Sequence, residues 1–132
     1  MMTAIRVLIV DDVMQVRQDL RTVLTLAGAA DPAHPIEIVG EAANGLEAIH
    51  QVTALQPDVV LMDLEMPVMN GYAAAAQIKQ GCPASRLVAL TVHDYETAQQ
   101  KALQSGMDDF IVKGAPVESL VQSITGVEKK LD

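Results

Sequence analysis

Five polar or charged side chains each follow a short apolar segment of this sequence, and together they could transfer a phosphoryl group. Asp11 and Asp12 follow the first such segment, Asp63 the third, Thr91 the fourth and Lys113 the fifth. A carboxylate directly after a buried segment is costly unless a charged or hydrogen-bonding group meets it. Asp63 therefore requires such a group close to its carboxylate.

The three aspartates would form a cation site if the first and third segments are neighbouring strands. Asp11, Asp12 and Asp63 would then converge, and like charges so close together raise one another's pKa values. A divalent cation relieves this repulsion. Because all the ligands are hard oxygens, Mg²⁺ is favoured, with Mn²⁺ as a second candidate, over zinc or copper.

Thr91 and Lys113 complete an arrangement suited to phosphoryl transfer. Catalysis of this reaction consists mainly of positioning and of fixed positive charge around the phosphoryl oxygens. The metal, the Lys113 ammonium and the Thr91 hydroxyl could each take one oxygen, and Asp63 could attack phosphorus to give an acyl phosphate. No glycine-rich phosphate loop is present, which argues against a nucleotide donor held by this chain.

Each of these residues also has an ordinary explanation when taken alone. Asp12 could cap a helix that begins near Val13. Thr91 could satisfy backbone groups at a strand end, and a single lysine such as Lys113 is commonly a solvated charge. The functional interpretation therefore rests on the set of residues.

The apolar segments predict five strands, and the segments between them predict helices. The strand segments are continuous in apolar character, which is typical of a parallel sheet buried on both faces. Residues 70–80 predict an alanine-rich helix capped by Asn70, 95–104 give the weakest helical pattern, and the last helix extends to about Lys130. Residues 27–35 predict a surface loop. The predicted strands are 5–10, 36–39, 59–62, 87–90 and 110–112.

Strands alternating with helices indicate a doubly wound α/β/α sandwich of three layers with right-handed crossovers. A length of 132 residues suits one domain. The net charge of −8 argues against direct binding of nucleic acid. The single cysteine, the short apolar segments and the lack of a signal-peptide pattern favour a soluble cytoplasmic protein without membrane attachment.

The sequence resembles the receiver domain of two-component response regulators over essentially its whole length. The similar stretches are VLIVDD at 7–12, VVLMDLEMPVMNG at 59–71, LVALTVHD at 87–94 and GMDDFIVKG at 106–114. The resemblance implies a flavodoxin-like sheet with strand order 2-1-3-4-5, with residues 1–132 as one receiver domain and the output domain absent from this chain.

The resemblance also implies a role for each site residue. Asp63 is implied to be the phosphoacceptor, in a Mg²⁺-dependent reaction with a sensor histidine kinase or a histidine phosphotransfer protein. Asp12 is implied to ligate the metal directly, Asp11 to assist through a water molecule, and Glu65 to contribute its backbone carbonyl.

A switch is implied as well. Thr91 and Lys113 would bind the phosphoryl group, and Phe110 would rotate inward as Thr91 moves, changing the face formed by the fourth helix, fifth strand and fifth helix. Glu65 and His93 would tune hydrolysis of the acyl phosphate, although an exposed loop position explains His93 equally well.

Two positions depart from the commonest receiver pattern. Gly114 follows Lys113 where many receivers have a cis-proline, which leaves the loop geometry open, and Val92 is larger than the usual residue after the threonine and could narrow the pocket. Both features, with the segment 113–124, resemble the branch that precedes helix-turn-helix DNA-binding domains. Transcription regulation through such a domain, and a dimer formed on phosphorylation, are the implied outputs.

Two alternatives stay open at this point. One is a Mg²⁺-dependent phosphohydrolase with an aspartyl nucleophile, although such enzymes commonly use an Asp-x-Asp pattern and a cap. The other is a receiver-like interaction module that is not phosphorylated. We expect a signalling phosphoacceptor that is not an enzyme and that promotes only its own phosphorylation and dephosphorylation.

Overall fold

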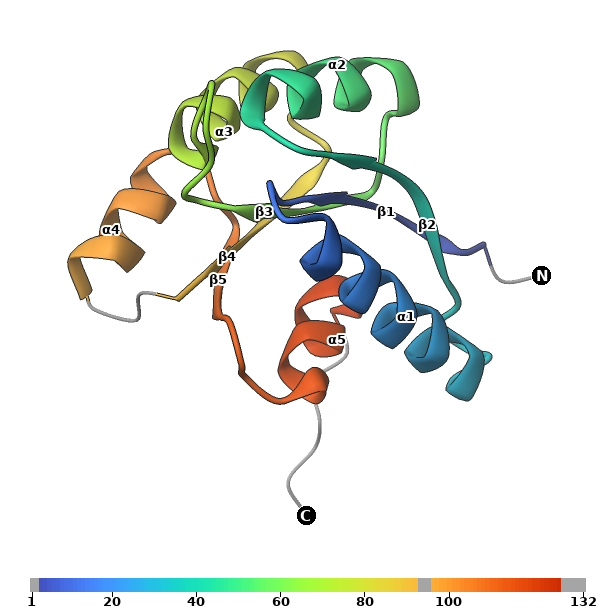
Figure 1. Ribbon diagram of the computed structural model, residues 1–132. Coiled ribbons are helices and arrows are strands. Elements are labelled where there is room, and N and C mark those ends of the chain that lie inside the picture. Colours follow the sequence, from blue (N-terminus) through green and yellow to red (C-terminus); the bar gives the residue numbers. More distant parts are fainter. Residues whose placement is uncertain (1–2, 93–95, 127–132) are drawn as a thin grey trace.

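The computed structural model describes residues 3–92 and 96–126, which form a parallel sheet between two layers of helices (Figure 1). The strand order is β2-β1-β3-β4-β5, so the order implied by the resemblance is confirmed. The expected strands are all present, and most extend by a residue or more beyond the predicted ends. They are β1 (Ile5–Val10), β2 (Ile36–Ala42), β3 (Val59–Asp63), β4 (Arg86–Thr91) and β5 (Asp109–Val112).

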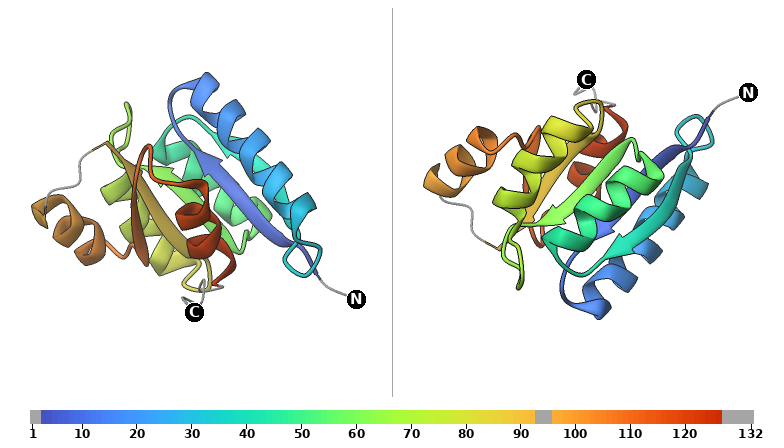
Figure 2. Two further views of the ribbon diagram at one scale, coloured as in Figure 1. Left: turned by 90° about the horizontal axis from the view of Figure 1, so that it is seen from below. Right: turned by 90° about the horizontal axis from the view of Figure 1, so that it is seen from above.

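The described residues form five helices. They cover both faces of the sheet, as Figure 2 shows from below and from above. The second, third and fourth helices lie on one face, and the first and fifth lie on the other. Asn70 caps α3, as predicted, by accepting a hydrogen bond from the Ala73 backbone N–H at 3.0 Å. The helices are α1 (Met14–Ala30), α2 (Gly45–Leu55), α3 (Gly71–Gly81), α4 (Glu96–Gln104) and α5 (Val117–Thr125).

The core is almost entirely aliphatic and lies on both faces of the sheet. Every residue of β3 is buried, which explains why this segment is continuous in apolar character rather than alternating. On one face the sheet packs against small side chains such as Ala48 and Ala74, and on the other against Leu24 and Leu120. None of the described helices is both long enough and apolar enough to cross a bilayer.

The first and fifth helices end at different places from those predicted. Residues 27–30 belong to α1 and not to the expected loop, which is therefore confined to 31–35. A Cβ at Gly28 would lie 2.8 Å from the backbone nitrogen of Ile36, so glycine lets α1 pass close to β2. Helix α5 ends at Thr125, well before Lys130, because Gly126 adopts φ +72° and its N–H bonds Gln122.

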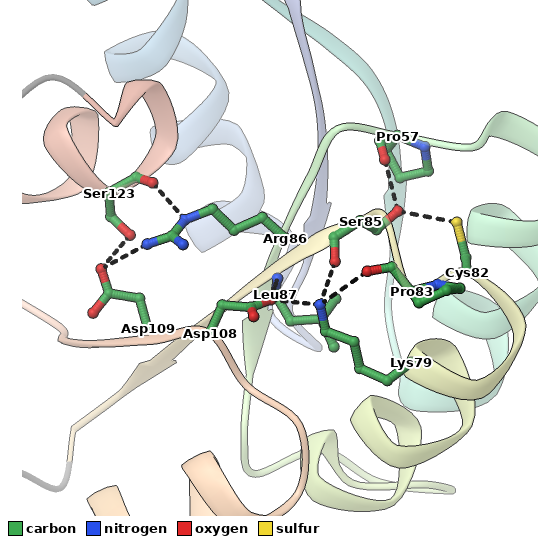
Figure 3. Close-up of polar contacts among 10 residues, drawn as sticks. All are labelled: Pro57, Lys79, Cys82, Pro83, Ser85, Arg86, Leu87, Asp108, Asp109 and Ser123. Atoms are coloured by element: carbon green, nitrogen blue, oxygen red, sulfur yellow. Dashed lines mark hydrogen bonds and ion pairs between the residues drawn. The ribbon is translucent and has the colours of Figure 1, made fainter.

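A network of ion pairs and hydrogen bonds at the N-terminal edge of the sheet joins the beginnings of β4 and β5 to α3 and α5 (Figure 3). The Lys79 Nζ atom of α3 lies 2.6 Å from Asp108 Oδ2. The Arg86 guanidinium bonds the Ser123 carbonyl at 2.9 Å, and the Ser123 hydroxyl donates to Asp109. These contacts lie at the edge opposite to Asp11, Asp63 and Lys113, so they support the fold without forming part of the candidate site.

Candidate functional site

The three predicted carboxylates meet at the carboxyl edge of the sheet. Strands β1 and β3 are neighbours, with Val10 opposite Met62, so Asp11 lies beside Asp63. One oxygen from each of Asp11, Asp12 and Asp63 can be chosen so that all lie within 4.8 Å of one another. The sheet order thus brings together residues that are about 50 positions apart in the sequence.

Asp11 and Asp12 are adjacent in the chain but differ in environment. Asp11 is fully buried, and its Oδ1 atom accepts a hydrogen bond from the Val13 N–H at 2.9 Å. Asp12 is exposed. The capping explanation for Asp12 is wrong, because Val13 is the N-cap residue of α1 and no side chain bonds the first turn there. The turn is closed by Asp11, and the carboxylate of Asp12 stays available for a ligand.

Lys113 bridges the two buried carboxylates. Its Nζ atom lies 2.9 Å from Asp11 Oδ2 and 3.4 Å from Asp63 Oδ2. Burial would lower the pKa of Lys113, but the hydrogen bond to Asp11 and the charges of Asp63 and Asp11 outweigh it and raise the pKa. The side chain therefore remains an ammonium and partly neutralises the aspartates.

Asp63 carries a charge that its surroundings do not fully compensate. Burial is the main cause that raises its pKa, and the charge of Asp11 adds to it, although the Glu65 N–H and Lys113 act in the opposite direction. The Glu65 N–H donates to Asp63 Oδ1 at 3.2 Å. A site with three carboxylates, one ammonium and a raised aspartate pKa fits a hard divalent cation such as Mg²⁺. The carboxylates that would hold it are those of Asp11, Asp12 and Asp63.

Thr91 lies next to Lys113 at the ends of β4 and β5. Thr91 is opposite Val112, and the backbone N–H of Lys113 donates to the Thr91 carbonyl at 2.6 Å. Thr91 is buried and Val92 is exposed. The five residues predicted from the strand ends therefore all lie at one edge of the sheet.

Three further positions were expected to matter at the site: Phe110, Gly114 and His93. Phe110 on β5 is half-buried and packs against the core cluster on the face covered by α2, α3 and α4. Gly114 adopts φ +93°, and no described peptide bond is cis, so the loop after Lys113 uses glycine in the left-handed region in place of a cis-proline. The prediction for His93 falls outside the described residues.

The loop that follows Asp63 is held closely by Gly71. The Gly71 N–H donates to the Leu64 carbonyl at 3.0 Å. A Cβ at this position would lie 2.6 Å from the Asp63 carbonyl oxygen and 2.9 Å from the Leu64 Cα atom. Both are backbone atoms, so the strand end that carries Asp63 would have to move.

We expect Gly71→Ala to destabilise the protein by about 1–3 kcal/mol, as overpacking in a closely packed region does, and to weaken binding of divalent cations. Urea unfolding and a Mg²⁺ titration would measure the two effects. Gly81→Ala is the matched control, because no atom lies within 4 Å of a Cβ at that helix position. If Gly71→Ala and Gly81→Ala had the same stability and the same Mg²⁺ affinity, the role assigned to Gly71 would be contradicted.

Arg17 is a residue of the site region that the sequence patterns did not reveal. Its guanidinium contacts the carbonyl of Asp11 and the carboxylate of Glu41. One signal was present: a cation near the N-terminus of a helix is unfavourable with the helix dipole and calls for an anionic partner. The identity of that partner depends on the pairing of β1 with β2.

Comparison with known sequences gives one family for most of the chain. The family model of the response regulator receiver domain matches residues 7–125. The chemotaxis protein CheY of Thermotoga maritima is 36% identical over 124 residues, which are 94% of this chain and 98% of that protein. A protein-glutamate methylesterase/protein-glutamine glutaminase of Pseudomonas fluorescens is 41% identical over 111 residues, and the match covers 83% of this chain but only 28% of that protein.

Solved structures give the same fold. The receiver domain of the putative response regulator NarL from Mycobacterium tuberculosis has a TM-score of 0.83 at 28% identity, covering 96% of this chain and all of that chain. A chain of the CheX–CheY–BeF₃–Mg²⁺ complex from Borrelia burgdorferi has a TM-score of 0.81 at 26% identity, covering 95% of this chain and 90% of that one.

Proposed function

Because this chain belongs to the response regulator receiver domain family, we propose that it accepts a phosphoryl group on Asp63 in a Mg²⁺-dependent reaction. The observation that favours Asp63 is that its carboxylate lies close to those of Asp11 and Asp12 and 3.4 Å from the Lys113 ammonium. Asp11 is fully buried and bonded at both oxygens, so a donor cannot reach it. Asp12 is exposed and lacks the lysine contact that Asp63 has.

The chemistry at Asp63 is a substitution at phosphorus. A carboxylate oxygen attacks, the bond from phosphorus to the donor atom breaks, and an acyl phosphate forms. Lys113 Nζ, already 3.4 Å from Asp63 Oδ2, and the Thr91 hydroxyl stabilise the negative charge on the phosphoryl oxygens. Mg²⁺, when bound, supplies further positive charge there. The groups that would hold it are the carboxylates of Asp11, Asp12 and Asp63 and the backbone carbonyl of Glu65, and Mn²⁺ is the second candidate.

The phosphoryl group then acts as a switch. It adds about 1.5 to 2 negative charges and new acceptor oxygens, which draw Thr91 towards Asp63. Phe110, which is half-buried at the sheet edge, moves into the space that Thr91 leaves and changes the face of α4, β5 and α5. Because phenylalanine has no hydroxyl, only packing favours its buried position. Glu65 and His93 tune the rate at which water removes the phosphoryl group.

Receiver domains are signalling modules that interact with histidine kinases and phosphotransfer proteins. We propose such a protein as the donor for this chain and a second copy of the chain as a partner after phosphorylation. We also propose that residues 1–132 form one receiver domain and that it acts as a signalling phosphoacceptor and not as an enzyme. The net charge of −8 argues against contacts of this domain itself with DNA, and we propose that any transcriptional output runs through a separate DNA-binding domain.

Incubation with acetyl phosphate and Mg²⁺, followed by intact-mass measurement, tests the proposal. We expect one added phosphoryl group in the wild type and none in Asp63→Asn. Asp19→Asn is the control, because Asp19 is exposed on α1 and its carboxylate accepts a hydrogen bond from the Gln15 side chain one turn before it. An adduct that persists in Asp63→Asn would exclude Asp63 as acceptor. Repeated turnover of many phosphoesters would favour the hydrolase, and no adduct at all would favour the interaction module.

A further inference from the structure

Arg17 on α1 joins the loop that carries Asp12 to the end of β2. Its NH1 atom donates to the backbone carbonyl of Asp11 at 2.6 Å, and its Nε atom donates to Glu41 Oε1 at 3.0 Å. The side chain is only 15% exposed. Arg17 contacts neither Asp63 nor Lys113 in any hydrogen bond or ion pair that the described residues form.

The Arg17 contact completes a set of bonds that holds the backbone of Asp11. The Asp11 N–H donates to the Ala42 carbonyl at 3.1 Å, and Asp11 Oδ1 accepts from the Val13 N–H at 2.9 Å. Without Arg17, the Asp11 carbonyl would be the one group of this residue with no partner. The peptide plane that begins at this carbonyl leads directly into Asp12.

Asp12 depends on this backbone for its position. Within residues 3–92 and 96–126, no side chain donates a hydrogen bond or forms an ion pair with the Asp12 carboxylate. The position of its Cα and Cβ atoms beside Asp11 and Asp63 is therefore set by the peptide that precedes it. A ligand held only through the backbone binds a metal well only if that backbone is fixed.

Glu41 holds Arg17 in turn. The Arg21 guanidinium bonds Glu41 Oε2 through Nε at 3.0 Å and NH2 at 2.8 Å, while Arg17 takes the other oxygen. Glu41 lies opposite Ile9 in the pairing of β2 with β1. The carboxylate is thus fixed from two sides, and it leaves the NH1 atom of Arg17 directed at Asp11.

We propose that Arg17 is a positioning residue for Mg²⁺: by bonding the Asp11 carbonyl, it holds Asp12 in the orientation that binds the metal. This inference rests on the metal site of the proposed function. It assigns to Arg17 no contact with the metal or with the phosphoryl group.

Two properties of Arg17 predict opposite changes in Mg²⁺ affinity when the residue is removed: the positive charge of its guanidinium and its hydrogen bond to the Asp11 carbonyl. The guanidinium is a positive charge near a cation site, so its charge alone opposes Mg²⁺ binding, and its loss would strengthen binding. If Arg17 positions Asp12, its loss weakens binding. Arg21 offers the matched control, because it carries the same charge and contacts the same Glu41 but does not reach Asp11.

Calorimetric titration with Mg²⁺ should separate these effects in the wild type and three variants. We expect Arg17→Ala to weaken binding about tenfold or more, in the range typical of residues that orient metal ligands. Arg17→Lys should weaken it as well, because one ammonium cannot reproduce the two directed bonds to Asp11 and Glu41. Arg21→Ala should bind as tightly as the wild type or more tightly. Thermal unfolding without Mg²⁺ checks that each variant is folded.

Equal affinities of Arg17→Ala and Arg21→Ala, or stronger binding by Arg17→Ala, would overturn the inference and leave the metal site itself intact. A wild type that binds no Mg²⁺ would instead overturn the proposed function. If Arg17→Ala does not fold, the Mg²⁺ affinity of Arg17→Lys is compared with that of Arg21→Ala instead, and equal affinities would again overturn the inference.

A second readout is the rate of phosphorylation by acetyl phosphate at increasing Mg²⁺ concentration. We expect Arg17→Lys to raise the half-saturating Mg²⁺ concentration and to leave the maximal rate nearly unchanged, because Arg17 does not contact the reacting atoms. A lower maximal rate at an unchanged half-saturating concentration would contradict the positioning role.

Discussion

Replacing Lys113 by methionine is expected to lower the free energy of unfolding by about 3 kcal/mol in Mg²⁺-free buffer at neutral pH, the cost of removing one partner from a buried ion pair. The ammonium lies 2.9 Å from Asp11 and 3.4 Å from Asp63, both of which are buried. Methionine keeps the length and apolar stem of the side chain, so the loss is one of charge and hydrogen bonds. Urea unfolding would measure it.

Mg²⁺ should recover part of the stability lost in Lys113→Met, because a bound cation also neutralises the carboxylates. Phosphorylation should not recover in the same way. The rate with acetyl phosphate at saturating Mg²⁺ is expected to fall by about 10²–10³, as when one donor to a developing anion is removed. Stability and phosphorylation thus report two separate roles of one ammonium.

Lys79→Met is the matched control for Lys113→Met. Lys79 is also a partly buried lysine, and its Nζ atom lies 2.6 Å from Asp108 at the opposite edge of the sheet (Figure 3). We expect this variant to lose stability by an amount that Mg²⁺ does not change, and to be phosphorylated at the wild-type rate. If Mg²⁺ stabilised both variants equally, Lys113 would not be part of the cation site.

The candidate site was predictable from the sequence because its residues occupy the ends of recognisable strands. Asp63 is the last residue of β3, and Lys113 directly follows β5. The strands of a parallel sheet bring their carboxyl ends to one edge, which is where ligands bind in such sheets. The sequence pattern does not say which carboxylate the lysine bonds. In the structure the shorter distance is to Asp11, at 2.9 Å against 3.4 Å to Asp63.

Contacts through backbone atoms were not predictable in the same way. Arg17 bonds a carbonyl, which every residue possesses, so no pairing of residue types marks it. The capping interpretation of Asp12 was wrong because α1 begins at Met14: Val13 occupies the N-cap position, and the Asp11 side chain bonds the Val13 N–H. Gly28 was placed in the predicted surface loop of residues 27–35, whereas it lies inside α1, where the close approach of Ile36 leaves no room for a side chain.

We expect Asp63→Asn to be more stable than the wild type in Mg²⁺-free buffer at neutral pH. Burial and the charge of Asp11 raise the pKa of Asp63, so the ionised carboxylate costs more in the folded protein than in the unfolded chain. Asparagine removes that charge and keeps an acceptor for the Glu65 N–H, which bonds Asp63 Oδ1 at 3.2 Å. Urea unfolding at a series of pH values would measure the difference.

The sign of the pH dependence follows from the raised pKa. Between the ordinary pKa of aspartate and the raised value, folded wild type keeps a proton on Asp63 that the unfolded chain has released, so its stability decreases as the pH rises through this window. Asp63→Asn lacks this contribution. Its advantage should therefore be full above the raised pKa and should vanish below the ordinary one.

Mg²⁺ should reverse the order of stability. A ligand that binds only the folded protein at one hundred times its dissociation constant stabilises it by about 2.7 kcal/mol, and Asp63→Asn loses one of the three carboxylates that would hold the ion. Wild type should then become the more stable protein. Asp19→Asn, which changes an exposed carboxylate on α1, should show neither effect. If Asp63→Asn were less stable than the wild type without Mg²⁺, the bond to Lys113 would outweigh burial, and the ionised aspartate would not need a metal to neutralise it.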